Sequence, residues 1–158
     1  MRLEQLLKME YLDDNLQAKN KTEALAELSE MVIKGPLRVD KRQVYDVLLQ
    51  REKLGSTGIG DGVAIPHGKI SNLEEIIIAF GRSKKGVAFD SIDGKLVHIF
   101  FLLLAPESST NQHLKILAKI CRMLKTAKFR EKLMEAESNN DLYEIIIEED
   151  NKHTNQFM

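Results

Sequence analysis

The feature that most constrains the fold is a run of seven apolar residues, Ile99–Ala105 (IFFLLLA). The run is far shorter than the ~18 apolar residues expected of a helix that crosses a bilayer. It lacks the polar alternation of a half-exposed strand, and Glu75–Arg82 (EIIIAFGR) has the same character. Such runs are typical of strands that are buried on both faces. We therefore predict a sheet that is covered by helices on both sides.

Helical periodicity is found on either side of these strands. Residues 22–34 (TEALAELSEMVIK) place apolar side chains three and four positions apart, and Gly35 followed by Pro36 is typical of a helix end. Asp40 is a candidate N-cap for the next helix, because Gln43 follows three residues later. The helices are expected over residues 22–34, 40–54, 110–124, 128–135 and 140–147.

The helix after the apolar strand is expected to begin at Ser109 or Thr110, since either hydroxyl suits an N-cap. Its apolar residues recur at helical spacing, and this spacing predicts which of them face the core. The predicted core face consists of Leu114, Leu117, Ile120, Cys121 and Leu124.

The chain is expected to form one domain. Its 158 residues fall within the usual size of a single domain, and it has no internal repeat or Gly/Ser linker. The alternation of helices and strands predicts an α/β fold, a three-layer sandwich with a mixed central β-sheet flanked by helices on both faces. We place the folded core at about residues 5–147 and expect residues 148–158 to be a flexible tail.

Charge and cysteine content limit the possible partners. The 23 Lys and Arg residues nearly balance the 24 Asp and Glu residues, so the net charge is −1 and no broad basic field favours nucleic acid. The single cysteine, Cys121, cannot form an internal disulfide, and the first residues (MRLEQLLKMEYLDD) lack the apolar stretch of a signal peptide. We expect a cytoplasmic protein that does not insert into membranes and recognises its partners locally.

A glycine-rich segment, Gly55–Gly62 (GSTGIGDG), is the first candidate for a functional site. It leads into a short apolar run that ends at Pro66, His67 and Gly68. A P-loop would need Gly-Lys-Ser/Thr at its end, and a dinucleotide site would need G-x-G-x-x-G between a strand and a helix. Neither pattern is present, and this segment runs from a helix into a strand. Nucleotide binding is therefore disfavoured.

The second candidate is a nucleophilic histidine. The four histidines, at positions 67, 98, 113 and 153, include no H-x-x-x-H pair, so the sequence gives little support for a metal site. A histidine with a pKa near ~6.5 is largely neutral at neutral pH and can accept a phosphoryl group. Pro66 stiffens the backbone that enters His67, and Gly68 leaves room for backbone amides to approach a phosphoryl oxygen. His67 is therefore the candidate nucleophile.

The same segment resembles a known family. Residues 51–68 (REKLGSTGIGDGVAIPHG) are similar to the active-site signature of the fructose/mannitol-type (type 2) enzyme IIA domains of the bacterial phosphoenolpyruvate-dependent phosphotransferase system. Residues 87–94 (VAFDSIDG), 102–106 (LLLAP) and His113-Leu114 are also similar to that family, so the resemblance covers about residues 5–147. Within the family, the chain is most similar to the nitrogen-regulatory IIA branch.

The resemblance implies a role for each of several residues. His67 would accept a phosphoryl group on its Nε2 atom (tele-phosphohistidine) from the phosphohistidine of HPr or of its nitrogen-branch equivalent. His113 would correspond to the second, non-phosphorylated histidine of the site, and Arg51 to the arginine that precedes the loop. No metal and no organic cofactor are implied.

Most of these residues also fit a purely structural role. His113 suits the edge of a helical core face, and Arg51 could complement the dipole at the end of its helix. Ser56 and Thr57 could be turn residues, although their hydroxyl groups are candidates for binding phosphate. The phosphate-binding candidates are Ser56, Thr57, Gly58 and Gly68. An apolar rim that docks the carrier is expected to involve Ile59, Val63 and Ile65.

Three functions fit this site. The first is a regulatory phosphocarrier in nitrogen or potassium metabolism. The second is a sugar-specific IIA component that passes phosphate to a IIB component. The third is a protein-binding regulator whose contacts with sensor kinases or potassium transporters depend on phosphorylation, which adds about −1.5 to −2 to a nearly neutral chain.

Overall fold

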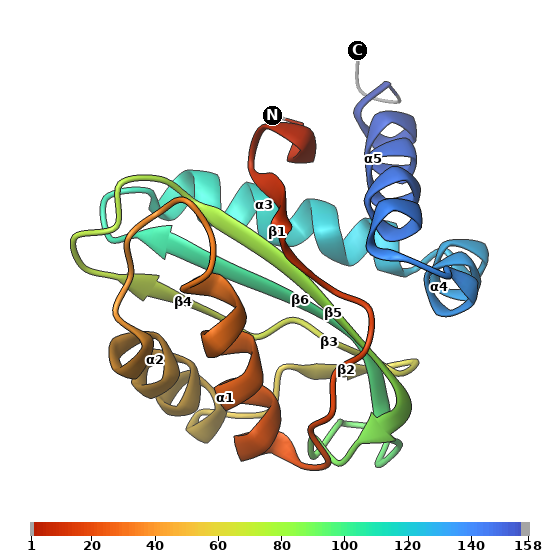
Figure 1. The fold of residues 1–158 in the computed structure, drawn as a ribbon, viewed down its shortest axis with the longest axis horizontal. Coiled ribbons are helices and arrows are strands. Elements are labelled where there is room, and N and C mark those ends of the chain that lie inside the picture. The colour runs from red at the N-terminus through yellow and green to blue at the C-terminus, as the bar shows by residue number, and fades with distance from the viewer. Residues whose placement is uncertain (1, 156–158) are drawn as a thin grey trace.

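The structure, a computed structural model, describes residues 2–155 and has three layers (Figure 1). A six-stranded sheet lies between two helices on one face and three on the other, which confirms the α/β sandwich with a mixed sheet. The N-terminal half contains η1 (Leu3–Gln5), β1 (Leu7–Asp13), α1 (Lys21–Val32), α2 (Lys41–Lys53), β2 (Gly58–Gly60), β3 (Val63–Ala64) and β4 (His67–Ile70). The C-terminal half contains β5 (Ile77–Val87), β6 (Val97–Pro106), α3 (Thr110–Leu124), α4 (Ala127–Glu135) and α5 (Asn139–Asn155).

Strand β6 is at the centre of the sheet. The strand order is β1-β5-β6-β3-β2, and β4 also pairs with β6. Strand β5 is antiparallel to β6, whereas β3 and β4 are parallel to it. In this register His67, the first residue of β4, lies opposite Leu103.

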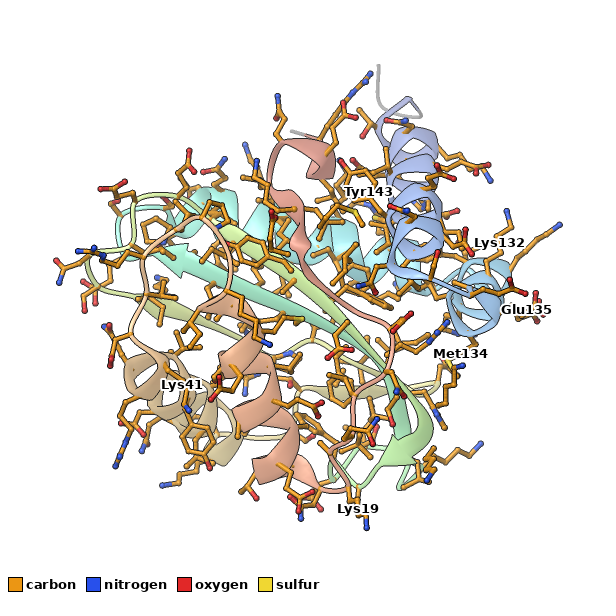
Figure 2. All side chains as sticks on the ribbon, viewed as in Figure 1. Lys19, Lys41, Lys132, Met134, Glu135 and Tyr143 are labelled. Carbon is orange, nitrogen blue, oxygen red and sulfur yellow. The ribbon has the colours of Figure 1, made fainter. Side chains whose placement is uncertain are left out.

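The side chains of β6 alternate between two separate hydrophobic cores. Phe101 and Leu103 belong to the core beneath α3, α4 and α5, while Phe100 and Leu102 belong to the core beneath α1 and α2. All four side chains are fully buried, as the uninterrupted apolar run predicted. Glu135, at the end of α4, is exposed, and its side chain points outward (Figure 2).

The first two helices begin and end close to their predicted positions. The Asp40 side chain accepts a hydrogen bond from the Gln43 amide at 2.9 Å, so the predicted N-cap of α2 is confirmed. Gly35 is not the C-cap of α1 as expected, because the helix ends at Val32 and its C-cap is Ile33. A Cβ atom at position 35 would lie 2.0 Å from the Tyr11 ring, so glycine is needed there for close packing.

The glycine-rich segment forms a small hairpin. Strands β2 and β3 are antiparallel, and the turn between them contains Asp61 and Gly62, both with positive φ. This is the φ pattern of the tight turns that join two strands. The expected loop is therefore part of the sheet.

The core face of α3 differs from the prediction. Leu114 is 57% exposed, whereas His113 and Ile116 are buried, together with Ile120, Met123 and Leu124. The buried stripe passes through His113, so spacing based on apolar residues alone placed the face about one residue too far along the helix.

The prediction of a flexible tail from residue 148 is wrong as far as Asn155, because α5 continues to that residue. Asp150 is completely buried, and its Oδ2 atom accepts a hydrogen bond from the Leu3 amide at 2.7 Å. Its Oδ1 atom pairs with Lys119 of α3. The last part of the prediction, residues 156–158, lies outside the described residues. Within residues 2–155, no helix is long and apolar enough to span a membrane.

The contacts of Asp150 predict that the end of α5 stabilises the domain. A chain that ends at Ile147 should lose at least about 3 kcal/mol of unfolding free energy, because the Lys119 charge and the Leu3 amide lose a buried partner. Urea denaturation of the two chains measures the difference. A chain that ends at Asn155 is the control, since it keeps the whole helix. Equal stability of the two shortened chains would contradict this role of Asp150.

Candidate functional site

The two ring nitrogens of His67 have different partners, a backbone carbonyl at Nδ1 and the Arg51 side chain at Nε2. It begins β4 directly after Pro66, and its Nδ1 atom lies 2.8 Å from the carbonyl oxygen of Ile65. A carbonyl oxygen can only accept a hydrogen bond, so Nδ1 carries the hydrogen atom and Nε2 keeps its lone pair. Nε2 is thus the ring nitrogen that a neutral imidazole can use as a nucleophile.

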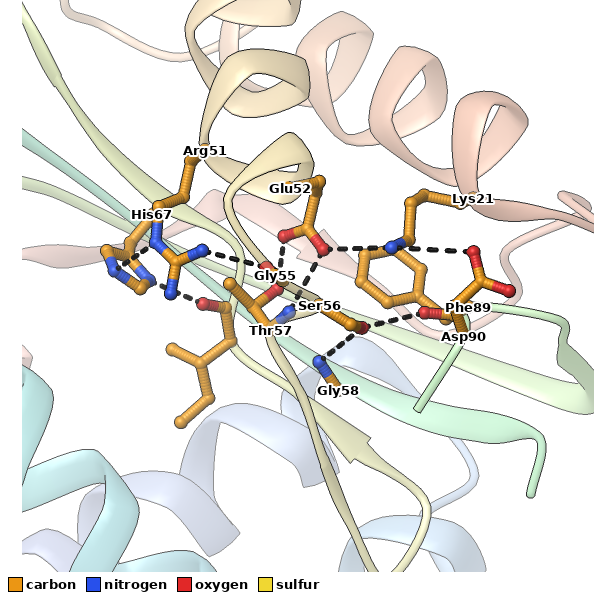
Figure 3. A network of polar contacts seen from close by, with 11 residues as sticks. Lys21, Arg51, Glu52, Gly55, Ser56, Thr57, Gly58, His67, Phe89 and Asp90 are labelled. Atoms are coloured by element: carbon orange, nitrogen blue, oxygen red, sulfur yellow. Dashed lines mark hydrogen bonds and ion pairs between the residues drawn. The ribbon is translucent and has the colours of Figure 1, made fainter. Parts of the chain in front are cut away.

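Arg51 lies beside Nε2 of His67. It belongs to the last turn of α2, and its Nε–H group donates to His67 Nε2 at 3.4 Å (Figure 3). Its Nη1 atom also donates to the carbonyl oxygen of Gly55 at 2.8 Å, which fixes the guanidinium plane. The positive charge of the guanidinium therefore lies next to Nε2.

His113 faces His67 from the first turn of α3. The two ring centroids are 5.6 Å apart, and the rings are inclined at 64°. His113 is buried, and its Nδ1 atom has no hydrogen-bond partner among the described residues. Its position also places it at the positive end of the helix dipole. The structure thus brings His67, Arg51 and His113 together, although they are far apart in sequence.

These side chains line an open pocket of about 450 Å³. Gly68 belongs to the same pocket, and a Cβ atom at this position would lie 2.4 Å from Val47 of α2. Glycine there allows β4 to pack closely against α2. The complete lining is Val47, Gln50, Arg51, Leu54, His67, Gly68, Lys69 and His113.

Three of the expected phosphate-binding residues do not line this pocket. The Ser56 hydroxyl donates to the carbonyl oxygen of Phe89 at 2.9 Å and accepts from the Gly58 amide at 3.0 Å. Thr57 is 3% exposed, and both its amide and its hydroxyl bond to Glu52. In this structure these groups support the hairpin and are turned away from His67.

The residues expected to form an apolar rim do not line the pocket. Val63 and Ile65 are buried in the core, and Ile59 is exposed but lies outside the pocket. Leu54, which is 85% exposed, lines the pocket instead. A lone exposed leucine after a helix end carries no sequence signal of this role.

Sequence reasoning also missed Lys69. Its side chain lies at the edge of the pocket, where its ammonium group donates to the Thr110 hydroxyl at 2.7 Å. Residues two apart on a strand share a face, so the position of Lys69 relative to His67 was a usable signal.

Burial lowers the pKa of both histidines below the ordinary value of 6.5. For His67, burial is the main cause and the Arg51 charge adds to it, while the Ile65 hydrogen bond and the Glu52 charge act in the opposite direction. For His113, burial is again the main cause, followed by the charges of His67 and Lys69. Both rings are therefore neutral at neutral pH. Among residues 2–155, no three His, Cys, Asp or Glu side chains gather as metal ligands would.

The sequence matches a known protein family over nearly its whole length. The sequence model of the family described as "Phosphoenolpyruvate-dependent sugar phosphotransferase system, EIIA 2" matches residues 5–149. The chain belongs to this family. It is thus an EIIA domain of type 2, a component of a phosphotransferase system, and the resemblance carried by residues 51–68 is confirmed.

Two curated relatives represent different branches of the EIIA family. The nitrogen regulatory protein of Bradyrhizobium diazoefficiens is 42% identical over 131 residues, which cover 83% of this chain and 85% of the relative. The fructose-specific EIIABC component of Bacillus subtilis is 35% identical over 150 residues, which cover 95% of this chain. The matched region spans only 24% of that longer relative.

Solved structures agree with this assignment. Nitrogen regulatory protein IIA-Ntr from Neisseria meningitidis superposes with a TM-score of 0.83 at 33% identity, covering 90% of this chain and 97% of that protein. The IIA of mannitol from Escherichia coli, solved in complex with phosphorylated IIB, has the same fold, with a TM-score of 0.73 at 23% identity and coverage of 89% of this chain and 98% of that one.

The lowered pKa values predict how this EIIA domain responds to acid. As the pH falls below 6.5, the unfolded chain binds protons on both histidines before the folded chain does, because the folded pKa values are lower. The free energy of unfolding should therefore fall from pH 6.5 down to the folded pKa values. Urea denaturation between pH 7.5 and 5.5 measures this loss.

The double variant His67→Gln with His113→Gln is the control for the acid response. It should lose less stability over the same pH range, since the two depressed pKa values are absent. The same loss in the wild-type protein and the double variant would contradict the assignment of the acid response to these histidines.

Proposed function

We propose that His67 Nε2 accepts a phosphoryl group from the phosphohistidine of a small carrier protein, HPr or its nitrogen-branch equivalent. The observation that carries the proposal is the Ile65 carbonyl bound to Nδ1, which leaves Nε2 as the unprotonated ring nitrogen, beside Arg51 in the open pocket. The bond between phosphorus and Nε2 forms as the donor P–N bond breaks, and the donor nitrogen keeps the electron pair of that bond. The transfer from the donor histidine to His67 exchanges one P–N bond for another. Positioning of the two rings and stabilisation of the phosphoryl charge are therefore sufficient for catalysis.

Arg51 and His113 would bind the transferred group. The Arg51 guanidinium already lies within 3.4 Å of Nε2, so a phosphoryl group on that atom would meet its positive charge. His113 would approach the group from the other wall of the pocket, together with the positive end of the α3 dipole. Gly68 and Lys69 complete the surroundings, and no metal or organic cofactor takes part.

The physiological role that we propose is regulatory. The support comes from the relatives named nitrogen regulatory proteins and from the structural similarity to IIA-Ntr. Phosphorylation would change the local charge strongly on a chain of net charge −1. Regulatory partners such as sensor kinases or potassium transporters could then distinguish the two states. The single cysteine cannot form an internal disulfide, which favours the reducing cytoplasm as the compartment in which the protein would work.

The second candidate function is transfer to a IIB component in sugar uptake. The fructose-specific relative favours it, because its EIIA region is similar to nearly the whole of this chain. A mannitol IIA of the same fold, solved in complex with phosphorylated IIB, also supports this candidate.

The phosphoacceptor assignment predicts the behaviour of His67→Gln. Incubation with phosphoenolpyruvate, enzyme I and carrier should label the wild-type protein with acid-labile phosphate, and the variant should take up none because Nε2 is absent. His98→Gln is the matched control, since His98 also bonds a carbonyl oxygen through Nδ1, that of Ser83, but lies outside the pocket. Labelling of His67→Gln at the wild-type rate would sink the assignment.

The regulatory role predicts slow transfer to IIB. When the phosphorylated protein is mixed with a fructose-type IIB component, most label should stay on the wild-type chain over minutes. The EIIA region of the Bacillus subtilis relative serves as the positive control, since its own chain is named as an EIIABC component. Transfer to IIB as fast as in this control would support the sugar-uptake role instead.

A further inference from the structure

Glu52 is a buried carboxylate next in sequence to Arg51 but outside the pocket. Its side chain is 2% exposed, and it belongs to the last turn of α2. Successive residues of a helix point about 100° apart, so one helix end can direct Arg51 toward His67 and Glu52 toward the hairpin. A buried carboxylate needs compensating partners, and its partners here show which part of the molecule it organises.

The partners of Glu52 hold the start of the hairpin. Its Oε1 atom accepts a hydrogen bond from the Thr57 amide at 3.0 Å, and its Oε2 atom accepts one from the Thr57 hydroxyl (Figure 3). The ammonium group of Lys21 lies 3.3 Å from Oε1 and balances the charge. Lys21 is held in turn by Asp90, at 3.6 Å, and by the Phe89 ring beneath it.

A continuous series of hydrogen bonds leads from Glu52 to His67. The carbonyl oxygen of Thr57 accepts from the Ile65 amide at 3.1 Å. The carbonyl oxygen of Ile65 is the group that binds His67 Nδ1, at 2.8 Å. The two residues between the carboxylate and the imidazole, Thr57 and Ile65, are both buried. Displacement of Thr57 would therefore move the carbonyl group that, together with the Arg51 Nε–H donor at Nε2, selects the ring tautomer.

We propose that Glu52 is a positioning residue for phosphoryl transfer, which fixes the tautomer and direction of the His67 ring through Thr57 and Ile65; this inference rests on the proposed phosphoacceptor role of His67. Arg51 faces Nε2 directly, while Glu52 controls Nδ1 from behind. Groups behind a reactive residue commonly hold its orientation, and their loss reduces activity without removing a reacting atom.

The charge of Glu52 acts on His67 as well. It raises the pKa of His67 and so partly offsets the lowering by burial and by Arg51. The other titratable group that faces the ring is His113 of α3, and Lys69 of β4 lies beside His113. Removal of the Glu52 charge should therefore lower the pKa of His67 further, which leaves the ring neutral and confines the expected defect to its orientation.

The test compares Glu52→Gln with Glu149→Gln. Glu149 is a second buried glutamate, 8% exposed and paired with His153 on α5, with no bond to the hairpin. Both variants replace one buried carboxylate by its neutral amide. The two readouts are the rate of carrier-dependent phosphorylation and the tautomer of His67, observed by ¹H–¹⁵N correlation of the imidazole ring.

We expect Glu52→Gln to be phosphorylated at least about tenfold more slowly, the lower end of effects seen when an orienting partner is removed. The Nε2–H tautomer of His67 should become detectable in this variant. Glu149→Gln should keep the wild-type rate and the wild-type tautomer. A Glu52→Gln variant with the rate and tautomer of Glu149→Gln would overturn the proposal.

A second pair of variants keeps the test decisive if Glu52→Gln folds poorly. Thr57→Val removes the hydroxyl that Glu52 binds, whereas Thr57→Ser retains it. Thr57→Ser should preserve more of the phosphorylation rate than Thr57→Val, and only Thr57→Val should show the altered tautomer. Equal rates and tautomers in the two variants would overturn the proposal.

Failure of the proposed function gives a different result. If the wild-type protein takes up no label on His67, the phosphoacceptor role is wrong. The ring tautomer is measured without phosphate, so it still shows whether Glu52 and Thr57 orient His67.

Discussion

The burial of β6 on both faces is the constraint on which the rest of the structure depends. Its apolar side chains leave no face for water, so one layer of helices must cover each side. Its backbone must also find partners on both edges, and β5 pairs with one edge while β3 and β4 pair with the other. The pairing with β4 fixes His67 opposite Leu103, and the helix that follows β6 carries His113 to the same place. The site is thus assembled around the end of a strand that contributes no polar group to it.

Local signals predicted the parts of the fold that local forces decide. The Asp40 cap and the uninterrupted apolar strands were found correctly because neighbouring residues determine them. Strand β5 continues to Val87, beyond the run Glu75–Arg82 that predicted it. Arg82 is fully buried because its guanidinium donates to carbonyl oxygens of Leu133 and Ala136 near the end of α4. Such partners are distant in sequence, and no pattern near Arg82 reveals them.

The residues of the candidate site were likewise predicted only in part from the sequence. The placement of His67 between Pro66 and Gly68 was visible in the sequence, and the family resemblance supplied Arg51 and His113. The hydroxyl groups of Ser56 and Thr57 looked equally suited to phosphate, yet the structure engages them within the hairpin. The burial of Glu52 was missed because the charge that compensates it, that of Lys21, comes from a different helix. Polar residues beside a motif can thus form hydrogen bonds that hold the backbone of the motif, and need not contact its ligand.

The contact between Leu3 and Asp150 has a consequence for how the domain can be joined to others. It brings the two ends of the described chain together beside α3 and α5, while α2 and β4, which carry the pocket, lie toward the other side (Figure 1). A partner domain linked at either end would therefore be tethered from one place and would leave the entrance to the pocket open. Through a linker long enough to reach the pocket, the tether would raise the effective concentration of that partner without any new contact surface.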